Sequence, residues 1–482
     1  MTITGIILIP IYVVAIFLPW RYVLTVAVLS ALLFDAAIVN FGNIGLQPGF
    51  VFMLLIILRT ALEIIIKNQG LSAYALRATA PLVFLLLASL LTLFVAVVVF
   101  AGNVMSLPGG FGMQVDWAEP YSFRRENVAQ MGYLLIDILT VYCLAHQAAH
   151  ARAGDFVRSS VLSITIAGFV SALVAFWELA HFVAGVPFPF AFFHSNVAYA
   201  EAYRQTVGGT PRISGPFPEP AALGFVFGGF IQFAWVRHRC SASIWSFALL
   251  AASVATLIMS TATTAYFGLA LFVLVVAKDL IFGAAGVFGA FVRGRTRSWK
   301  LLATVAVGLA AFACYVLLEW NTLHDVFNIV VVDKGGSSSF KERAAVDLMA
   351  LNIFVATWGI GLGLGSHRPN SLVMTLLSNV GIVGTLVFTI FAYRVLLSQG
   401  RPSGSSLRWF VLGMLAMGAF SGPTLTLALL WIGFGLALGA SIEAHKSTAQ
   451  RIDRGRRPGG LSGVRGSAFP AIKSMIRSEE TG

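Results

Sequence analysis

Long apolar runs are the feature of this 482-residue sequence that most limits what it can fold into. Several of them reach the roughly 20 residues that an α-helix needs to cross the hydrocarbon core of a membrane, whereas the strands of a membrane barrel would alternate apolar and polar residues. Only 11% of the residues are charged, against about 25% in soluble domains. We therefore expect an all-α, polytopic integral membrane protein with about 12 to 14 transmembrane helices.

The positions of the basic residues predict how the chain is oriented. The formal net charge is +12, and Lys and Arg gather in short segments between apolar runs and in the tail. The positive-inside rule places such segments in the cytoplasm. Counting crossings on this basis gives about thirteen, with the N-terminus outside and the C-terminus inside. The outer loops then fall at about 102–126, 184–219 and 319–370 of a transmembrane domain 1–442, followed by a disordered cytoplasmic tail, 443–482, that touches anionic membrane lipid.

Several kinds of site are excluded by residues that are missing or badly spaced. The basic residues form no nucleic-acid-binding stretch outside the positive-inside pattern. Cys143, Cys240 and Cys314 are far apart, without a CxxC pair or metal-ligand spacing, so we expect no disulfide framework and no zinc site. The outer loops contain no DxD carboxylate pair, which favours chemistry without a metal or other cofactor. The first apolar run has no basic n-region or cleavage site and is predicted to be a retained helix.

Two local predictions concern the first third of the chain. Arg59 and Glu63 stand four residues apart inside an apolar run and should pair on one helical face. The basic segment Lys67–Arg77 is predicted to be a loop, and the next crossing is expected to begin at Pro81.

The most informative stretch is Lys341–Gly384, a polar, glycine-punctuated segment between apolar runs. Together with the outer loop before it, this stretch supplies three cations near helix starts: Arg212, Arg343 and His367. A guanidinium stays charged at any working pH and matches phosphate oxygens with a planar fork. Two converging arginines therefore suit a diphosphate.

Other residues of the two loops suggest how such a site could work. The glycines from Gly361 to Gly365 would let the backbone approach an anion closely, and Asn370 is expected to cap the following helix, whose first N–H groups attract anions. No strand precedes these glycines, so a dinucleotide site is rejected. Either His367 or Glu219 could remove a proton from a hydroxyl group, and His367 could instead donate to a diphosphate leaving group.

Four short segments in this order resemble one known family. They are RISGPFPEP from Arg212, the pair Glu342-Arg343, GIGLGLGSHRPNS from Gly359, and LLSNVGIVGTLVF from Leu376. The pattern is similar to that of the O-antigen ligase and O-antigen polymerase superfamily, a group of bacterial envelope glycosyltransferases. The motifs cover about 60 residues, and the expected helix number and loop placement agree over nearly the whole chain.

The resemblance implies a C-type glycosyltransferase architecture in the bacterial inner membrane, with a cavity open to the periplasm. It implies an inverting, metal-independent transfer of a glycan from undecaprenyl diphosphate to an acceptor sugar hydroxyl, alongside flippase and chain-length regulator proteins. By position, Arg212 and Arg343 would hold the diphosphate, and His367 would assist attack or departure. We assign further donor contacts to four neighbours: Gly363, Gly365, Ser366 and Arg368.

One departure from the family and two alternatives stay open. Many relatives have an Arg after the Ser of the STATT segment, where this chain has Thr263 and Thr264, which puts a donor contact there in doubt. The Phe-Pro-Glu-Pro form of the first motif favours a polysaccharide polymerase over a ligase that transfers polymer to the lipid A core. A flippase for lipid-linked oligosaccharide could use the same cations, but it should carry its polar residues within the spans, whereas here they lie mainly in the outer loops.

Overall fold

The computed structural model describes residues 1–42, 44–107, 117–198, 206–207, 210–291, 338–398, 402–422 and 424–456. These residues are α-helical apart from connecting loops and three short antiparallel hairpins. The hairpins pair β1 (Val39–Phe41) with β2 (Ile44–Leu46), β3 (Met105–Ser106) with β4 (Glu119–Pro120), and β5 (Thr206–Val207) with β6 (Thr210–Pro211). The predicted all-α fold is confirmed.

Seven described segments are long and apolar enough to span a membrane. They are α3 (Pro48–Ile66), α4 with the π-helix η1 (Ala73–Phe100), α5 (Arg125–His150), α6 (Asp155–Ala184), α8 (Pro220–Ser241), the segment Leu372–Leu397, and Ala428–Lys446 within α17. The segment Leu372–Leu397 consists of α14 (Leu372–Thr375), the π-helix η5 (Leu376–Val380) and α15 (Gly381–Leu397). The chain is therefore a multi-pass membrane protein by the length and composition of its helices.

The remaining described helices are shorter or lie only partly in the apolar bundle. They are α1 (Ile3–Phe17), α2 (Trp20–Leu32), α7 (Phe190–Phe193), α9 (Ile244–Met259), α10 (Thr263–Phe291), α13 (Ser338–Ala356), α16 (Pro402–Gly418) and α17 (Ala428–Arg456). The crossing expected at 301–318 lies outside the described residues. The total of 12 to 14 transmembrane helices thus stays a prediction.

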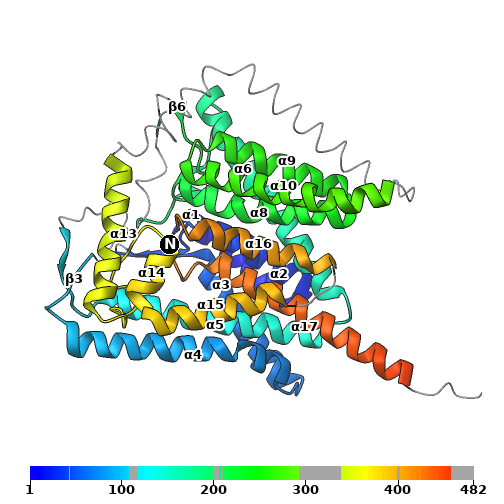
Figure 1. Cartoon of the computed structure of the whole chain (residues 1–482), viewed down its shortest axis with the longest axis horizontal. Helices are drawn as coiled ribbons and strands as arrows, with labels where there is room; N and C mark the ends of the chain where they lie inside the picture. Colours follow the sequence, from blue (N-terminus) through cyan, green and yellow to red (C-terminus); the bar gives the residue numbers. More distant parts are fainter. Residues whose placement is uncertain are drawn as a thin grey trace, which may run out of the picture.

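Most helices lie side by side in one bundle, whereas α13 runs across its end (Figure 1). The closest packed pairs include α8 with α16 and α5 with α17. Helix α13 packs against α14, η5 and β3 at the end of the bundle that also holds the N-terminus. We call this the site end, because Arg212, Glu219 and His367 lie there.

The opposite end, which we call the basic end, is held by a network centred on Glu63. Its carboxylate accepts from Gln147 at 2.9 Å and forms ion pairs with Lys67 at 3.1 Å and Arg59 at 3.4 Å. The indole N–H of Trp20 also donates to it. The predicted Arg59–Glu63 pair is confirmed, and its additional partners explain how charge is tolerated beside apolar helices.

Helix α4 begins earlier than predicted. It starts at Ala73, where the Ser72 hydroxyl accepts from the N–H of Ala75 at 3.3 Å, so Arg77 is helical and Pro81 lies inside the helix. A proline removes one backbone hydrogen bond, but membrane helices tolerate this where neighbouring helices surround the site. The serine cap and the continuous apolar face outweigh the proline.

The boundary predicted between residues 442 and 443 falls inside α17, which continues to Arg456. Glu443 is buried, and its carboxylate accepts from the N–H groups of Gly154, Phe156 and Val157 at 2.8, 3.2 and 3.1 Å. A carboxylate at these N–H groups satisfies donors that the first turn of α6 leaves unpaired. The helix therefore extends because Glu443 has a structural partner; residues 457–482 of the predicted tail lie outside the described residues.

Candidate functional site

Glu219 and Arg343 bring the two outer loops together at the site end. Glu219 is the N-cap residue of α8 and has an extended backbone, which Pro218 and Pro220 on either side favour. Arg343 lies on α13 in the second loop. Its Nη2 atom is 3.6 Å from Oε2 of Glu219, although 124 residues separate the two along the chain (343 − 219).

Arg212 belongs to the same group of charges. Burial lowers the pKa of its guanidinium, the Glu219 carboxylate raises it, and the Arg343 charge lowers it again. Tyr266, one turn after the STATT segment, also raises this pKa. The four side chains are thus close enough to interact, and we call Arg212, Glu219 and Arg343 the charged cluster.

The charged cluster keeps hydrogen-bonding capacity for a ligand. A separation of 3.6 Å is too long for a hydrogen bond, so the Arg343–Glu219 contact is a loose ion pair. The Arg343 side chain is 39% exposed and that of Glu219 is 17% exposed. Two guanidinium groups against one carboxylate leave an excess positive charge, which suits an anion with several oxygens.

A mostly apolar pocket opens beside Glu219. Its empty volume is about 470 Å³, and it lies between the start of α8, the residue that follows α2, and the α16–α17 linker. The lining residues are Phe34, Glu219, Ala221, Ala222, Phe225, Val226, Ser421, Gly422, Thr424 and Leu427. An apolar pocket with one carboxylate at its wall can hold an uncharged group next to a proton acceptor.

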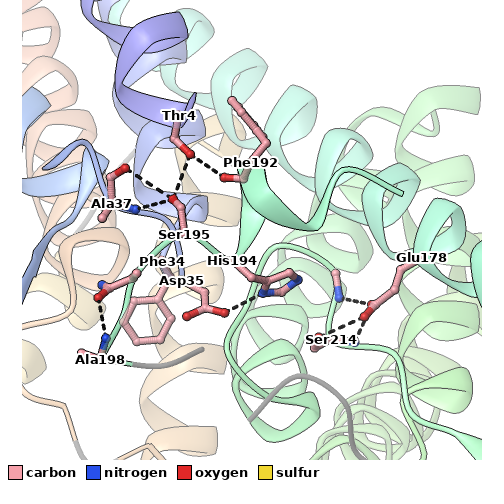
Figure 2. Close-up of polar contacts among 12 residues, drawn as sticks. Thr4, Phe34, Asp35, Ala37, Glu178, Phe192, His194, Ser195, Ala198 and Ser214 are labelled. Carbon is pink, nitrogen blue, oxygen red and sulfur yellow. Dashed lines mark hydrogen bonds and ion pairs between the residues drawn. The ribbon is translucent and has the colours of Figure 1, made fainter. Parts of the chain in front are cut away.

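Glu178, a residue that the sequence analysis missed, fixes the segment after Arg212. The Glu178 side chain is buried on α6, and its carboxylate accepts from the N–H groups of Ser214 at 2.7 Å and Gly215 at 2.5 Å (Figure 2). The Ser214 hydroxyl donates to the other oxygen at 3.2 Å. Three donors on one carboxylate hold the backbone two residues from Arg212. The signal available in the sequence was an acidic residue inside an apolar run.

Replacing Glu178 with glutamine is expected to destabilise the protein by about 1 to 3 kcal/mol, because an amide offers one oxygen acceptor where three donors converge. The free energy of unfolding of the purified protein in detergent would measure this loss. Ser214→Ala, which removes only the hydroxyl contact, is the matched control and should cost about 1 kcal/mol. Equal losses in the two variants would contradict the role given to the carboxylate.

A second buried pair lies next to Glu178. Nδ1 of His194 is 2.5 Å from Oδ2 of Asp35, and both side chains are fully buried (Figure 2). Burial raises the pKa of the Asp35 carboxyl to about 6, although the contact with His194 opposes the shift. Asp35 follows Phe34, which lines the pocket. The pair therefore anchors one pocket wall to the loop that precedes Arg212.

The glycines predicted to approach a ligand pack instead against the protein itself. Gly361, Gly363 and Gly365 all have positive φ, between +81° and +87°. An added Cβ atom would lie 2.6 Å from Leu93 at Gly363 and 2.6 Å from the Glu126 carbonyl at Gly365. The Ser366 hydroxyl is also engaged, since it donates to Leu362 O at 2.6 Å and accepts from Asn127 at 2.8 Å. These contacts account for the small residues by packing.

His367 is 3% exposed, and both of its ring nitrogens contact backbone groups. Nδ1 accepts from the N–H of Leu107 at 3.2 Å, so the neutral ring carries its proton on Nε2, which donates to the carbonyl of Val346 at 3.3 Å. Burial lowers the pKa of His367 from 6.5 to about 4. The contacts favour a role in holding α13, where Val346 lies one turn from Arg343.

The pKa of His367 predicts how stability depends on pH. The unfolded chain binds a proton at His367 below pH 6.5 and the folded chain only below about 4, so stability should rise with pH across this window. The difference corresponds to about 3 kcal/mol. Unfolding of wild type and His367→Gln, followed from pH 4 to pH 6.5, would measure it. The Asp35 contribution is common to both, so parallel curves would contradict the prediction.

The start of the helix after Asn370 is already occupied by an internal anion. The carboxylate of Asp347 on α13 accepts from the N–H groups of Asn370 at 2.6 Å and Ser371 at 3.3 Å. The prediction that Asn370 is the N-cap was wrong: Ser371 is the N-cap, and its hydroxyl accepts from Met374 N–H. Asn370 contacts the α16–α17 linker instead, through Gly422 and Phe420. Arg368 lies in the same loop, half-buried, and its N–H donates to Leu107 O at 3.2 Å.

Comparison with protein-family models finds none that matches the chain, and comparison with curated proteins finds no match. The functional conclusion therefore depends on the charged cluster, the pocket beside it and the resemblance of the short motifs.

Proposed function

We propose that this protein is a membrane glycosyltransferase of C-type architecture that polymerises O-antigen or exopolysaccharide units. The donor would be a glycan on undecaprenyl diphosphate, and the acceptor a sugar hydroxyl of another lipid-linked unit. The observation that supports this proposal is the approach of Arg212 and Arg343 to Glu219 beside an apolar pocket. The substrate class comes from the motif resemblance.

In the proposed reaction Glu219 takes the proton of the acceptor hydroxyl. The hydroxyl oxygen attacks the anomeric carbon from the face opposite the diphosphate, and the bond from that carbon to the diphosphate oxygen breaks. Its electron pair leaves with undecaprenyl diphosphate, and Arg212 and Arg343 stabilise the charge that develops there. The anomeric configuration is inverted. His367 acts through its contact with Val346 in this proposal, because its ring is neutral and buried.

The orientation follows from the two ends of the bundle. The network around Glu63 and the basic segments lie at one end and the charged cluster at the other. By the positive-inside rule, the site end would face the periplasm of a bacterial inner membrane. A donor whose glycan has crossed the membrane would meet the charged cluster on that side.

The test is to supply purified full-length protein in liposomes with lipid-linked repeat units and to follow products by mass, together with complementation of a strain that lacks the gene. Lipid-linked polymer formed in the liposomes would support a polymerase. Polymer transferred only when lipid A core is added would identify the ligase alternative. Repeat units that stay single in liposomes, and that accumulate on the cytoplasmic face of the deletion strain, would identify a flippase.

A further inference from the structure

Helix α5 carries a buried acid in the middle of its length. Asp137 lies twelve residues after Arg125, where α5 begins, and thirteen before His150, where it ends. Its side chain is 0% exposed, and among the described residues neither carboxyl oxygen has a hydrogen-bond partner. The charged cluster and its pocket do not include this residue. An ionised carboxylate without a partner is strongly unfavourable in such surroundings.

The helices packed against α5 do not supply a countercharge at the level of Asp137. These helices are α3, α4 and α17. Their charged and histidine side chains lie toward the basic end: Arg59, Glu63, Arg77, Glu443, His445, Lys446 and the residues of α17 after it. On α5 itself the nearest titratable groups are Tyr133, Tyr142, Cys143 and His146, at least one turn away. The carboxyl group is therefore compatible with its site only when a cation neutralises it.

Two further hydroxyl groups lie between Asp137 and the basic end. Thr140 follows Asp137 by one helical turn, and Thr60 precedes Glu63 by one turn on α3; both are buried, and neither hydroxyl has a hydrogen-bond partner among the described residues. Other threonines inside these helices, such as Thr79 and Thr165, donate to the carbonyl four residues before them. Thr140 and Thr60 thus retain donor and acceptor capacity that the helix backbone does not use.

Helices α3 and α5 run side by side, which brings these groups into one line. Phe50 stacks on Tyr133 at 4.2 Å, and Gln147 donates to Glu63 at 2.9 Å. The offset between the helices is nearly constant, 83 residues at the first contact (133 − 50) and 84 at the second (147 − 63). Thr60 is therefore level with the turn between Thr140 and Gln147. The order from the centre of the bundle is Asp137, Thr140, Thr60 and then the Gln147–Glu63 pair.

We propose that Asp137 is a proton-binding site inside the membrane-spanning bundle, connected to the basic end by the hydroxyl groups of Thr140 and Thr60. The carboxylic acid releases its proton along this line toward the Glu63 network and becomes a carboxylate, and the reverse step restores it. One carboxyl group among apolar helices favours a proton over a metal ion, because hard cations need several oxygen ligands. This site does not depend on the proposed glycosyl transfer.

Infrared difference spectroscopy of the full chain in lipid tests the proposal directly. The spectrum of wild type minus Asp137→Asn should show the C=O stretching band of a protonated carboxyl at neutral pH. The band should shift after transfer to D2O and disappear at alkaline pH. If the Asn variant does not fold, Asp137→Ser serves as the reference, and the D2O shift of the wild type stands by itself. Absence of the band at neutral pH would overturn the proposal.

The route and the ligand have their own controls. Thr140→Val should slow the D2O shift, whereas Thr165→Val, which removes a hydroxyl bonded to its own helix on α6, should leave the rate unchanged. Equal rates in both variants would overturn the route. Replacing choline by sodium ions should not change the band. Its loss in sodium would show that a metal cation, and not a proton, occupies the site.

Discussion

Replacing Arg343 with alanine is expected to reduce the rate of polymer formation by about 100- to 1,000-fold, the usual effect of removing one preorganised group that stabilises a developing charge. Arg343 lies 3.6 Å from Glu219 and shares the charged cluster with Arg212. Without it, only one guanidinium faces the leaving diphosphate. The initial rate with a lipid-linked donor in liposomes, at equal protein content, would measure the change.

Two further variants separate the site charge from the general charge of the outer surface. Arg343→Lys keeps the charge but loses the planar fork, so its rate should fall between those of wild type and Arg343→Ala. Arg124→Ala is the matched control, because Arg124 pairs with Glu119 at 2.6 Å and is not part of the charged cluster. Similar rates for Arg343→Ala and Arg124→Ala would show that the charged cluster is not a diphosphate site.

Replacing Gly381 with alanine is expected to destabilise the protein by about 2 to 6 kcal/mol, through backbone strain and overpacking together. Gly381 has φ of 65° and ψ of −171°, a conformation that only glycine adopts readily. An added Cβ atom would lie 2.0 Å from the carbonyl oxygen of Ile360, which is part of the backbone and cannot rotate away. The free energy of unfolding in mixed detergent micelles would report the loss.

Gly132→Ala is the control for that substitution. Gly132 lies inside α5, and nothing stands within 4 Å of an added Cβ atom. Alanine is the better helix former, so this variant should be unchanged or more stable by up to about 1 kcal/mol. If the two variants behaved alike, the close packing between Gly381 and the glycine-rich segment would not be important for stability.

The sequence alone was sufficient to predict the class of the protein and much of its local structure. Apolar runs of sufficient length imply membrane helices, because a span must satisfy its own backbone hydrogen bonds. The Arg59–Glu63 pair followed from a spacing of four residues, since such neighbours meet on one face of a helix. The types of residue in the charged cluster were also visible, because arginine and glutamate are uncommon so close to apolar runs.

Only the tertiary structure decided which of these residues have internal partners. The glycines after Ile360, the Ser366 hydroxyl and the His367 ring are engaged with Leu93, Glu126, Asn127 and Val346, which are distant in sequence. Helix starts that were expected to attract an external anion proved to hold Asp347 and Glu443. Glu178 and Asp35 remained unnoticed for the same reason. A buried polar side chain is defined by contacts across the fold, and contacts between distant segments leave no periodic signal in one sequence.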